Sequence, residues 1–417
     1  MYLNPGSRRF RMAVGSEIYV DKTEMIRHLN AVVDTSQRYV SVSRPRRFGK
    51  TMAADMLCAY YGRGTDARKL FEGMKLAKNS RPHDGSLPWD TYLGKFDVIR
   101  LTMSEFLEDG MLVHDGMRRM QQLVSREVRN SHPNVDFSSE GGLSMDMQAA
   151  YSSDGTRFVV IIDEWDAPMR ERKDDEAGQR AYLDFLRNWL KDKDWLALAY
   201  ITGILPIKKY GIHSALNMFD EYSMASPKSL AEFTGFTAQE VRDICDQRRL
   251  RYDAMCEWYD GYVLTDAPSP DLVLDPVTDL ESKRLKVFNP LSVVSATRYR
   301  RLESYWSHTE TYEALEEYIR MDFDGLRESV ALLMDGGRVS ANLGTYQNDM
   351  STFRSRDDVL ALFVHLGYLG WDADTSEVFI PNREILQVFR DSTRTPEWDL
   401  AQTRDQAAPG TSTIIAR

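Results

Sequence analysis

The sequence is poor in the features that mark secreted and membrane proteins. Cysteine is scarce, with 3 in 417 residues, and their positions form neither a disulfide framework nor a zinc-binding spacing. No apolar run approaches the roughly 20 residues that a membrane-spanning helix needs, and Met1–Gly15 lacks the apolar core of a secretory signal. We therefore expect a soluble protein of a reducing compartment, the cytoplasm, with no membrane partner.

A surplus of positive charge is also missing. Lys and Arg number 53 against 63 Asp and Glu, which gives a formal net charge of −10. This balance argues against a protein that coats nucleic acid, although it leaves a local basic patch open. The 7 histidines are dispersed, without the spacing of metal ligands. What the chain does have is length for two or three domains and 42% hydrophobic residues to fill their cores.

The first half of the chain alternates strand and helix patterns. Strand patterns occur at Tyr39–Val42, Phe96–Leu101, Phe158–Ile162 and Leu196–Ile201. The run Phe158–Ile162 is apolar throughout, which is typical of a strand buried on both faces. Between them, apolar residues recur every three or four positions, as on one face of a helix, over residues 52–60, 113–128 and 182–190. Strands that alternate with helices predict an α/β fold, a parallel sheet flanked by helices.

Beyond about Pro227 the pattern becomes mostly helical. Thr237 followed by Glu240 predicts a capped helix start, and a Pro- and Asp-rich loop over residues 265–279 interrupts the helices. Near the end, a helix (358–366), two short strands (368–371 and 378–380) and a helix (384–389) follow in the order of a winged helix.

The segment Ser43–Thr51 lies between a predicted strand and a predicted helix. Backbone N–H groups at such a helix start point at phosphate, where the helix dipole is also positive. Gly49 permits close approach, Lys50 reaches the β- and γ-phosphates of ATP, and the Thr51 hydroxyl ligates Mg²⁺. Arg44 stands where the pattern has its first glycine, so the entry of this loop must differ from the usual one. The alternative is a Gly-Lys-Thr that merely caps a helix.

The strand at Phe158–Ile162 ends in two carboxylates. In a P-loop enzyme the first carboxylate holds Mg²⁺, and the second polarises the attacking water as general base. We therefore assign Asp163 to the metal and Glu164 to the base, with Asp166 close enough to assist. The alternative is an ordinary strand end with solvated acids.

The next predicted strand ends at Thr202, whose hydroxyl is our candidate sensor of the γ-phosphate. A simple strand-end turn is an equal alternative for this residue. Lys208 and Lys209 follow and could face phosphate, and His213 could approach the site. A solvated loop is the favoured interpretation of all three.

Taken in order, these residues resemble the prokaryotic AAA-ATPase-like family, whose cellular role is largely unassigned. The resemblance covers about residues 10–392 and is carried by Tyr19–Thr23, Arg44–Thr51, Ile162–Pro168, Thr202–Lys209, Trp258–Tyr262, Phe288–Pro290, Tyr305–Trp306 and Ile380–Glu384. It implies that Arg44 is a family trait. It also implies that Arg46 and Arg47 belong to the motif, where they either bind phosphate or act in trans as an arginine finger, and that the region 19–26 borders the adenine.

The resemblance implies an ATPase core followed by a helical lid and a winged-helix-like module. We place a P-loop nucleotide-binding domain at 1–227, the lid at 228–320, the module at 321–392 and a loose tail at 393–417. The expected ATP-binding residues are Arg46, Arg47, Phe48, Gly49, Lys50 and Thr51. The expected catalytic residues are Lys50, Glu164 and Thr202, and the expected metal ligands are Thr51 and Asp163.

Members of this family often carry a restriction-nuclease-like domain after the Ile-Pro-Asn segment, and the tail from Asp391 is too short for one. We therefore expect the ATPase part alone. A literal PD…ExK string occurs at Pro270–Asp271 and Glu281–Lys283. A nuclease needs its carboxylates on adjacent strands that converge on one metal, so a surface hairpin is the favoured interpretation.

The sequence thus predicts a Mg²⁺-dependent ATPase whose nucleotide state switches the lid against the core. One alternative is a non-hydrolysing nucleotide-binding switch or scaffold, against which Glu164 argues. Another is the ATPase half of a DNA-processing nuclease system, against which the acidic charge argues. A protein partner or a homo-oligomer stays open. Nucleic acid is not favoured, because the terminal module carries Asp372, Asp374 and Glu377.

Overall fold

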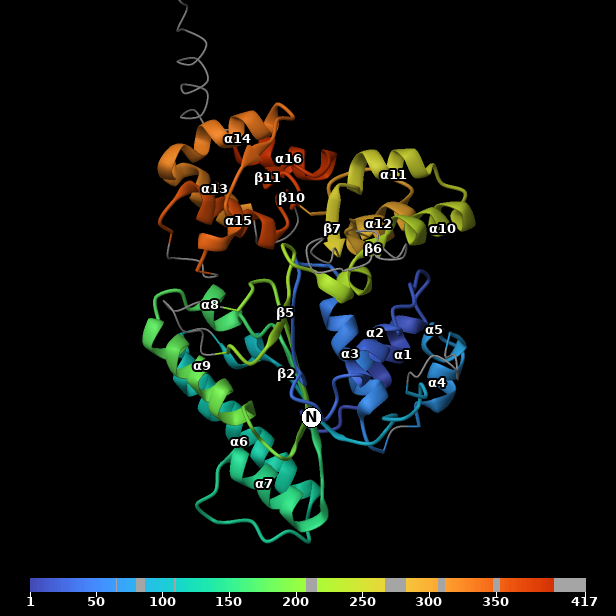
Figure 1. Ribbon diagram of the computed structural model, residues 1–417, viewed down its shortest axis with the longest axis vertical. Helices are drawn as coiled ribbons and strands as arrows, with labels where there is room; N and C mark the ends of the chain where they lie inside the picture. Colours follow the sequence, from blue (N-terminus) through green and yellow to red (C-terminus); the bar gives the residue numbers. More distant parts are fainter. Residues whose placement is uncertain are drawn as a thin grey trace, which may run out of the picture.

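The computed structural model describes residues 1–64, 66–79, 87–108, 110–207, 216–266, 283–306, 312–347 and 353–393. Its centre is a five-stranded sheet in the order β2-β3-β4-β1-β5, in which every neighbouring pair is parallel (Figure 1). The strands are β1 (Tyr39–Ser43), β2 (Asp97–Thr102), β3 (Phe158–Asp163), β4 (Leu196–Gly203) and β5 (Asp220–Tyr222). The predicted parallel sheet is confirmed, and β5 is an additional short edge strand.

The register of the sheet brings the polar strand ends together. Asp163 pairs with Thr102 on one side and with Thr202 on the other, and Ser43 pairs with Gly203. Since the strands are parallel, their carboxyl ends lie at one edge of the sheet, which is where ligands of open α/β sheets bind.

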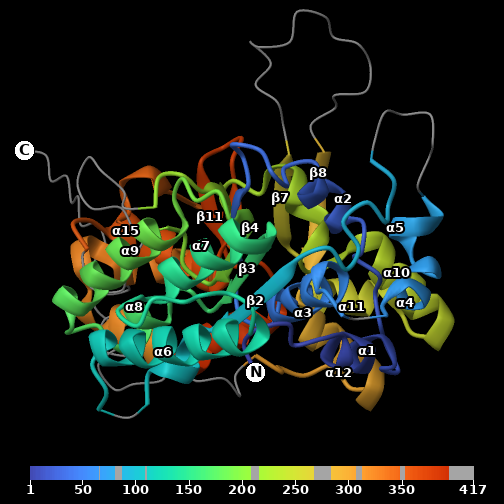
Figure 2. The same ribbon diagram turned by 90° about the horizontal axis from the view of Figure 1, so that it is seen from below.

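Helices cover both faces of this sheet, as the view from below in Figure 2 shows. Alternate strand residues face opposite sides, so that Val160 and Ile162 join one hydrophobic core while Val159 and Ile161 join the other. The first core includes α6 (Val113–Ser131), α7 (Leu143–Asp154) and α9 (Glu176–Leu190). The second includes α1 (Arg8–Val14), α2 (Met25–Asn30), α3 (Lys50–Tyr61), α4 (Arg68–Glu72) and α5 (Lys75–Lys78). Two short elements, η1 (Met103–Phe106) and α8 (Ala167–Glu171), follow β2 and β3.

After β5 the chain passes through η2 (Lys228–Phe233) into what we call the second unit, residues 236–299. It contains an antiparallel sheet of order β6-β8-β7 and three helices. These elements are β6 (Phe236–Thr237), α10 (Ala238–Arg248), α11 (Tyr252–Tyr259), β7 (Tyr262–Asp266), β8 (Lys283–Phe288) and α12 (Pro290–Tyr299). The predicted capping box of Thr237 and Glu240 is confirmed at the start of α10. The predicted helices are thus joined by a small sheet that the sequence reading missed, and the PD…ExK string falls almost wholly in residues 267–282, outside the described residues.

Residues 312–393 form the third unit. It consists of α13 (Tyr312–Met321), η4 (Phe323–Gly325), α14 (Leu326–Met334), β9 (Val339–Ser340), η5 (Leu343–Thr345), α15 (Arg356–Leu366), β10 (Gly370–Asp372), β11 (Glu377–Phe379) and α16 (Arg383–Ser392). The helix–strand–strand–helix order predicted near the end is confirmed in α15, β10, β11 and α16, and β9 completes a three-stranded sheet. Within the described part of the chain, no helix has the length and apolar character to cross a membrane.

The second and third units lie together beyond one end of the parallel sheet (Figure 1). They are joined by Glu384 of α16, which is almost fully buried. Its carboxylate accepts hydrogen bonds from the Ser292 hydroxyl and from the backbone N–H groups of Tyr305 and Trp306. Three motifs that are distant in the sequence therefore meet at one carboxylate.

Candidate nucleotide-binding site

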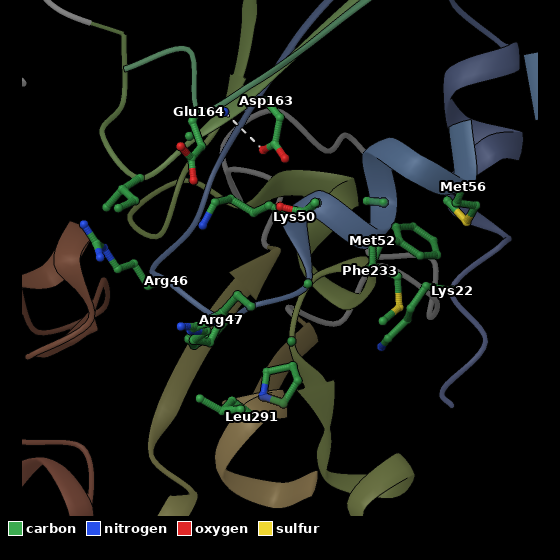
Figure 3. Close-up of a pocket in the computed structure, with 18 of the residues that line it drawn as sticks. Lys22, Arg46, Arg47, Lys50, Met52, Met56, Asp163, Glu164, Phe233 and Leu291 are labelled. Carbon is green, nitrogen blue, oxygen red and sulfur yellow. Dashed lines mark hydrogen bonds between the residues drawn. The ribbon is translucent and has the colours of Figure 1, made fainter. Parts of the chain in front are cut away.

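A cavity of about 730 Å³ lies between the carboxyl edge of the parallel sheet and the second unit. The phosphate loop and the start of α3 line it, and so do Asp163, Glu164 and Gly203 at the ends of β3 and β4. The second unit contributes Phe236 and Leu291. Figure 3 shows Lys50 between the acidic strand end and the rest of the loop. The volume is in the range of small-molecule and cofactor sites.

The loop from Arg44 to Gly49 turns directly into α3. Gly49 has a φ of 87°, in the left-handed region that glycine enters without strain, and nothing lies within 4 Å of the position a Cβ would take. Gly49, Lys50 and Thr51 all line the cavity. The positive end of α3, a 12-residue helix, therefore faces the cavity and favours an anion there.

Lys50 is held by the loop itself. Its ammonium donates to the carbonyl oxygen of Arg44 at 2.9 Å and to that of Pro45 at 2.7 Å. Burial lowers the pKa of Lys50 to about 8, although the nearby carboxylates of Asp163 and Asp166 oppose this decrease. A phosphate that enters the cavity can replace these neutral carbonyl acceptors with charged ones, which form stronger hydrogen bonds.

Arg44, in place of the expected glycine, is fully buried and does not line the cavity. Its Nη1 donates to the carbonyls of Ser43 at 2.9 Å and of Tyr222 in β5 at 2.8 Å. Burial lowers the pKa of the guanidinium to about 10. The side chain thus fastens β5 to the entry of the loop and points away from the phosphate end, which explains why an arginine is tolerated at this position.

Asp163 has the properties of a metal ligand. It is 1% exposed, and its Oδ2 has no hydrogen-bond donor among the described residues. Burial raises the pKa of this carboxyl, and a hydrogen bond with the Thr51 hydroxyl and the charge of Lys50 oppose the rise. Mg²⁺ takes oxygen ligands, commonly one or two from the protein and the rest from phosphate and water. Thr51 and Asp163 therefore fit Mg²⁺ as its protein ligands.

Arg100 of β2 forms an ion pair with Asp163. Arg100 is 6% exposed, and its guanidinium lies 3.5 Å from Oδ2 of Asp163 and 3.0 Å from Oδ1 of Asp55 in α3. Sequence reasoning missed this residue. The signal was present, since a charged residue inside a predicted strand needs a partner once it is buried, as Arg100 is in β2.

Glu164 lines the cavity together with Asp163 and Asp166, and it differs from both because its side chain is exposed. Its side chain is 41% exposed, and its φ of 53° lies in a region costly for a residue other than glycine. Asp166, by contrast, is fully buried and accepts from the N–H groups of Ile204 and Leu205 and from Nε of Arg170. Asp166 therefore links the ends of β3 and β4. These contacts indicate a structural role, in place of the assisting catalytic role that we expected.

Thr202 is fully buried and is not among the residues that line the cavity. Its hydroxyl donates to the carbonyl of Val42 at 2.8 Å. The hydroxyl therefore joins β4 to β1, which gives no support to the predicted role as a γ-phosphate sensor. Outside the described residues lie Lys208, Lys209 and His213.

The three residues before Gly49 play different parts. Arg46 and Arg47 both line the cavity, on the flank opposite Met52 (Figure 3). Arg47 is exposed and has a φ of 67°. Phe48 is fully buried, and its backbone carbonyl accepts from the N–H of Gly235 at 3.0 Å. Phe48 therefore lines the cavity with a buried ring, and Arg46 and Arg47 line it with charged side chains.

The other end of the cavity is mainly apolar. The segment expected to border the adenine does reach it, through Tyr19, Val20 and Lys22. The Lys22 ammonium is bonded to Glu240 at 2.6 Å, so it joins the N-terminal segment to the second unit. Sequence reasoning did not find the remaining lining residues, which come from distant segments and include Phe233, Phe236, Pro290, Leu291 and Val294.

Comparison with known proteins finds a family match in the part of the chain that carries the phosphate loop. The family model described as "Predicted AAA-ATPase" (AAA-ATPase-like) matches residues 8–213. An Azotobacter chroococcum mcd 1 protein, described as an uncharacterized protein in the vnfD 5′ region, is 25% identical over 303 residues, 70% of this chain and 51% of that protein. The chain thus spans about half the length of this curated relative.

Among solved structures, the Aeropyrum pernix ORC2 protein (ADPNP-ADP complexes) aligns over 97% of this chain and 99% of its own, with 12% identity and a TM-score of 0.31. So low a score carries no argument, and the fold rests on the sheet and loop described above. Four of the five parallel strands, β1 to β4, fall in the same part of the chain as the Gly49–Lys50–Thr51 helix start and the family match. Over residues 8–213 the chain therefore matches the AAA-ATPase-like family.

Proposed function

We propose that this chain binds ATP with Mg²⁺ and hydrolyses it, and that the bound nucleotide sets the position of the second unit against the parallel sheet. The observation that carries the proposal is the meeting of Lys50, Asp163 and Glu164 in one cavity at the start of α3. A helix N-terminus, a buried lysine and two carboxylates of unequal exposure are the parts that phosphoryl transfer to water needs.

Each residue has a distinct task in this proposal. Lys50 exchanges its carbonyl acceptors for the β- and γ-phosphates, and its charge draws electron density toward the leaving oxygen. Thr51 and Asp163 would hold Mg²⁺, which supplies neutralisation of the phosphate charge when bound. Glu164, exposed to the cavity, orients a water molecule and accepts its proton as that water attacks the γ-phosphorus.

The nucleotide would also contact the second unit. Phe236, Leu291 and Val294 of that unit line the same cavity as Lys50. A base bound at the apolar end buries the surface of these three side chains, so nucleotide binding favours the position in which the second unit contacts the parallel-sheet domain. Loss of the γ-phosphate weakens this preference. The scarcity of cysteine agrees with work in a reducing compartment such as the cytoplasm.

The test is Mg²⁺-dependent ATP hydrolysis by the purified chain, with ATP binding followed in parallel. Lys50→Ala is expected to lose binding, and Glu164→Gln is expected to bind ATP with turnover reduced by about 10²–10⁴-fold. Lys69→Ala, an exposed lysine of α4 outside the cavity, is the matched control.

The outcomes separate the alternatives. A wild-type chain that binds ATP but does not hydrolyse it, even with DNA or protein extract added, is a nucleotide-dependent switch. A wild-type chain that does not bind ATP contradicts the proposal as a whole. Hydrolysis that survives Glu164→Gln unchanged removes Glu164 from the role of base.

A further inference from the structure

Arg170 is a buried arginine beside the proposed catalytic base. It belongs to α8, and its side chain is only 9% exposed, yet it lines the cavity. Burial opposes its charge, but the carboxylates of Asp166, Glu164 and Glu171 outweigh this effect and raise the pKa of the guanidinium. The residue is therefore a fixed positive charge at the phosphate end of the cavity.

The two sides of this guanidinium are held differently. Nε donates to Asp166 at 3.1 Å, and Asp166 is itself fixed by the backbone N–H groups of Ile204 and Leu205. The other two nitrogens make longer contacts, since Nη1 lies 3.8 Å from Oε1 of Glu171 and Nη2 lies 4.0 Å from Oε2 of Glu164. One side of the guanidinium is thus anchored to the ends of β3 and β4, while the other side lies beside the proposed base, Glu164, and beside Glu171, which also lines the cavity.

The charge of Arg170 also reaches Lys50. Lys50 and Arg170 line the same cavity, and the charge of Arg170 is one of the influences that lower the pKa of the Lys50 ammonium. Two cations in one cavity repel each other, and both attract a multiply charged anion that lies between them. The terminal phosphate of ATP is such an anion, whereas ADP lacks it.

We infer that Arg170 contacts the γ-phosphate of ATP and serves as an arginine finger supplied by the same chain. This inference rests on the proposed function. An arginine in this role neutralises the charge that spreads over the phosphoryl oxygens as the bond to the leaving oxygen breaks. Because α8 follows β3 directly, the site needs no arginine from a second copy, and Arg46 and Arg47 remain residues of the loop entrance.

The first experiment compares the affinities for ATP and ADP in the presence of Mg²⁺. Wild type is expected to bind ATP more tightly than ADP. Arg170→Ala is expected to lose most of this preference, with ATP affinity falling about tenfold or more and ADP affinity changing by less than about threefold. Arg170→Lys keeps the positive charge but loses the planar guanidinium, so its preference for ATP over ADP should lie between those of wild type and Arg170→Ala.

The second experiment tests whether the arginine acts in cis. Arg170→Ala is expected to lower kcat by about 10³-fold. Mixing it with Lys50→Ala, which keeps Arg170 but cannot bind the phosphates, should recover no activity, and the specific activity of wild type should not depend on protein concentration. Arg187→Ala, an exposed arginine of α9, is the control.

Two results would overturn the inference. One is an Arg170→Ala chain whose ATP and ADP affinities change together or not at all, while its thermal unfolding matches wild type. The other is recovery of activity in the mixture, which would place the arginine on a second copy. The affinity comparison needs no turnover, so it decides the role of Arg170 even in a chain that binds ATP without hydrolysing it. Absence of nucleotide binding by wild type would overturn this inference together with the proposed function.

Discussion

The ring of Phe48 in the phosphate loop meets the ring of Tyr262 in β7 edge to face, with centroids 5.4 Å apart and planes at 84°. The Tyr262 hydroxyl donates to the carbonyl of Gly367, beyond α15, at 2.6 Å. Gly367 also packs against the loop, since a Cβ at this position would lie 2.7 Å from Cβ of Pro45. Tyr262 therefore connects the phosphate loop with both the second and the third unit.

Substitution of Tyr262 tests this connection in two steps. Tyr262→Phe keeps the ring against Phe48 but leaves the buried Gly367 carbonyl without its donor, so the free energy of unfolding should fall by about 1–2 kcal/mol. Tyr262→Ala also removes the ring, which should cost about 3–5 kcal/mol and weaken ATP binding because the loop loses its support. Denaturant unfolding with and without ATP measures both effects. Equal losses in the two variants would show that the ring contact contributes nothing.

The protonation of Lys50 makes a prediction about pH. Its pKa of about 8 means that the ammonium loses its proton as the pH rises above that value. A neutral lysine has no charge for the phosphates, so ATP affinity should fall by up to about tenfold per pH unit above pH 8 and level off below it. Titration of a fluorescent ATP analogue from about pH 7.5 to 9.5 measures this dependence. Lys50→Gln should bind weakly at every pH in this range, and a wild-type affinity that stays constant would contradict the prediction.

The sequence predicts those parts of the fold that local patterns encode. The run Phe158–Ile162 is apolar throughout because both faces of β3 are covered, and such a run is unambiguous. Among the residues of β7 whose burial is described, 262–265, only Tyr262 and Leu264 are fully buried, and a Pro- and Asp-rich segment follows the strand. The sequence of a short strand with one buried face resembles that of residues flanking a loop, and for this reason the sequence did not predict the second sheet.

The site residues also divide into those that local sequence patterns predict and those that depend on the topology. The positions of Gly49, Lys50 and Thr51 follow from a strand, a turn and a helix start that are contiguous in the chain. The direction of the Arg44 side chain depends on the carbonyl of Tyr222, far along the sequence. Whether Thr202 faces the cavity or bonds to Val42 depends on the order of the strands, which no local pattern encodes. Contacts set by topology are therefore the ones that the sequence alone could not supply.

Removal of Arg100 should destabilise the fold, because it takes a cation from two carboxylates, the buried Asp163 and the partly buried Asp55. Arg100→Met leaves Asp55 and Asp163 without their common cation, so the free energy of unfolding at neutral pH should fall by about 3–5 kcal/mol. Without the guanidinium the folded-state pKa values of both carboxyls rise further, so part of the stability should return as the pH falls and the carboxylates take up protons. Denaturant unfolding at about pH 7 and about pH 5 measures this recovery.

A control variant removes one of the two carboxylates that Arg100→Met leaves without a cation. In the double variant with Asp55→Asn, only Asp163 remains unpaired, and the loss should be smaller than in Arg100→Met alone. A loss that is the same at both pH values, and unchanged in the double variant, would mean that packing rather than charge explains the effect.

Glu384 should make the stability of the joined second and third units depend on pH. Burial raises the pKa of this carboxyl to about 7, even though the hydrogen bonds from Ser292, Tyr305 and Trp306 oppose the increase. The folded chain then keeps a proton that the unfolded chain releases near pH 4.5. Since the folded state binds more protons in this interval, its contribution of about 3 kcal/mol is present below pH 4.5 and is lost as the pH rises through 7.

Glu384→Gln isolates this effect, because glutamine is neutral at every pH. Its Oε1 can accept from the N–H groups of Tyr305 and Trp306, and its amide can donate to the Ser292 hydroxyl, so the three partners stay satisfied. The variant should be more stable than wild type above pH 7, and the two should converge toward pH 5. Thermal unfolding across this range measures the difference. A variant that is less stable than wild type at pH 8 would show that the ionised carboxylate stabilises the contact between the two units, which contradicts a raised pKa.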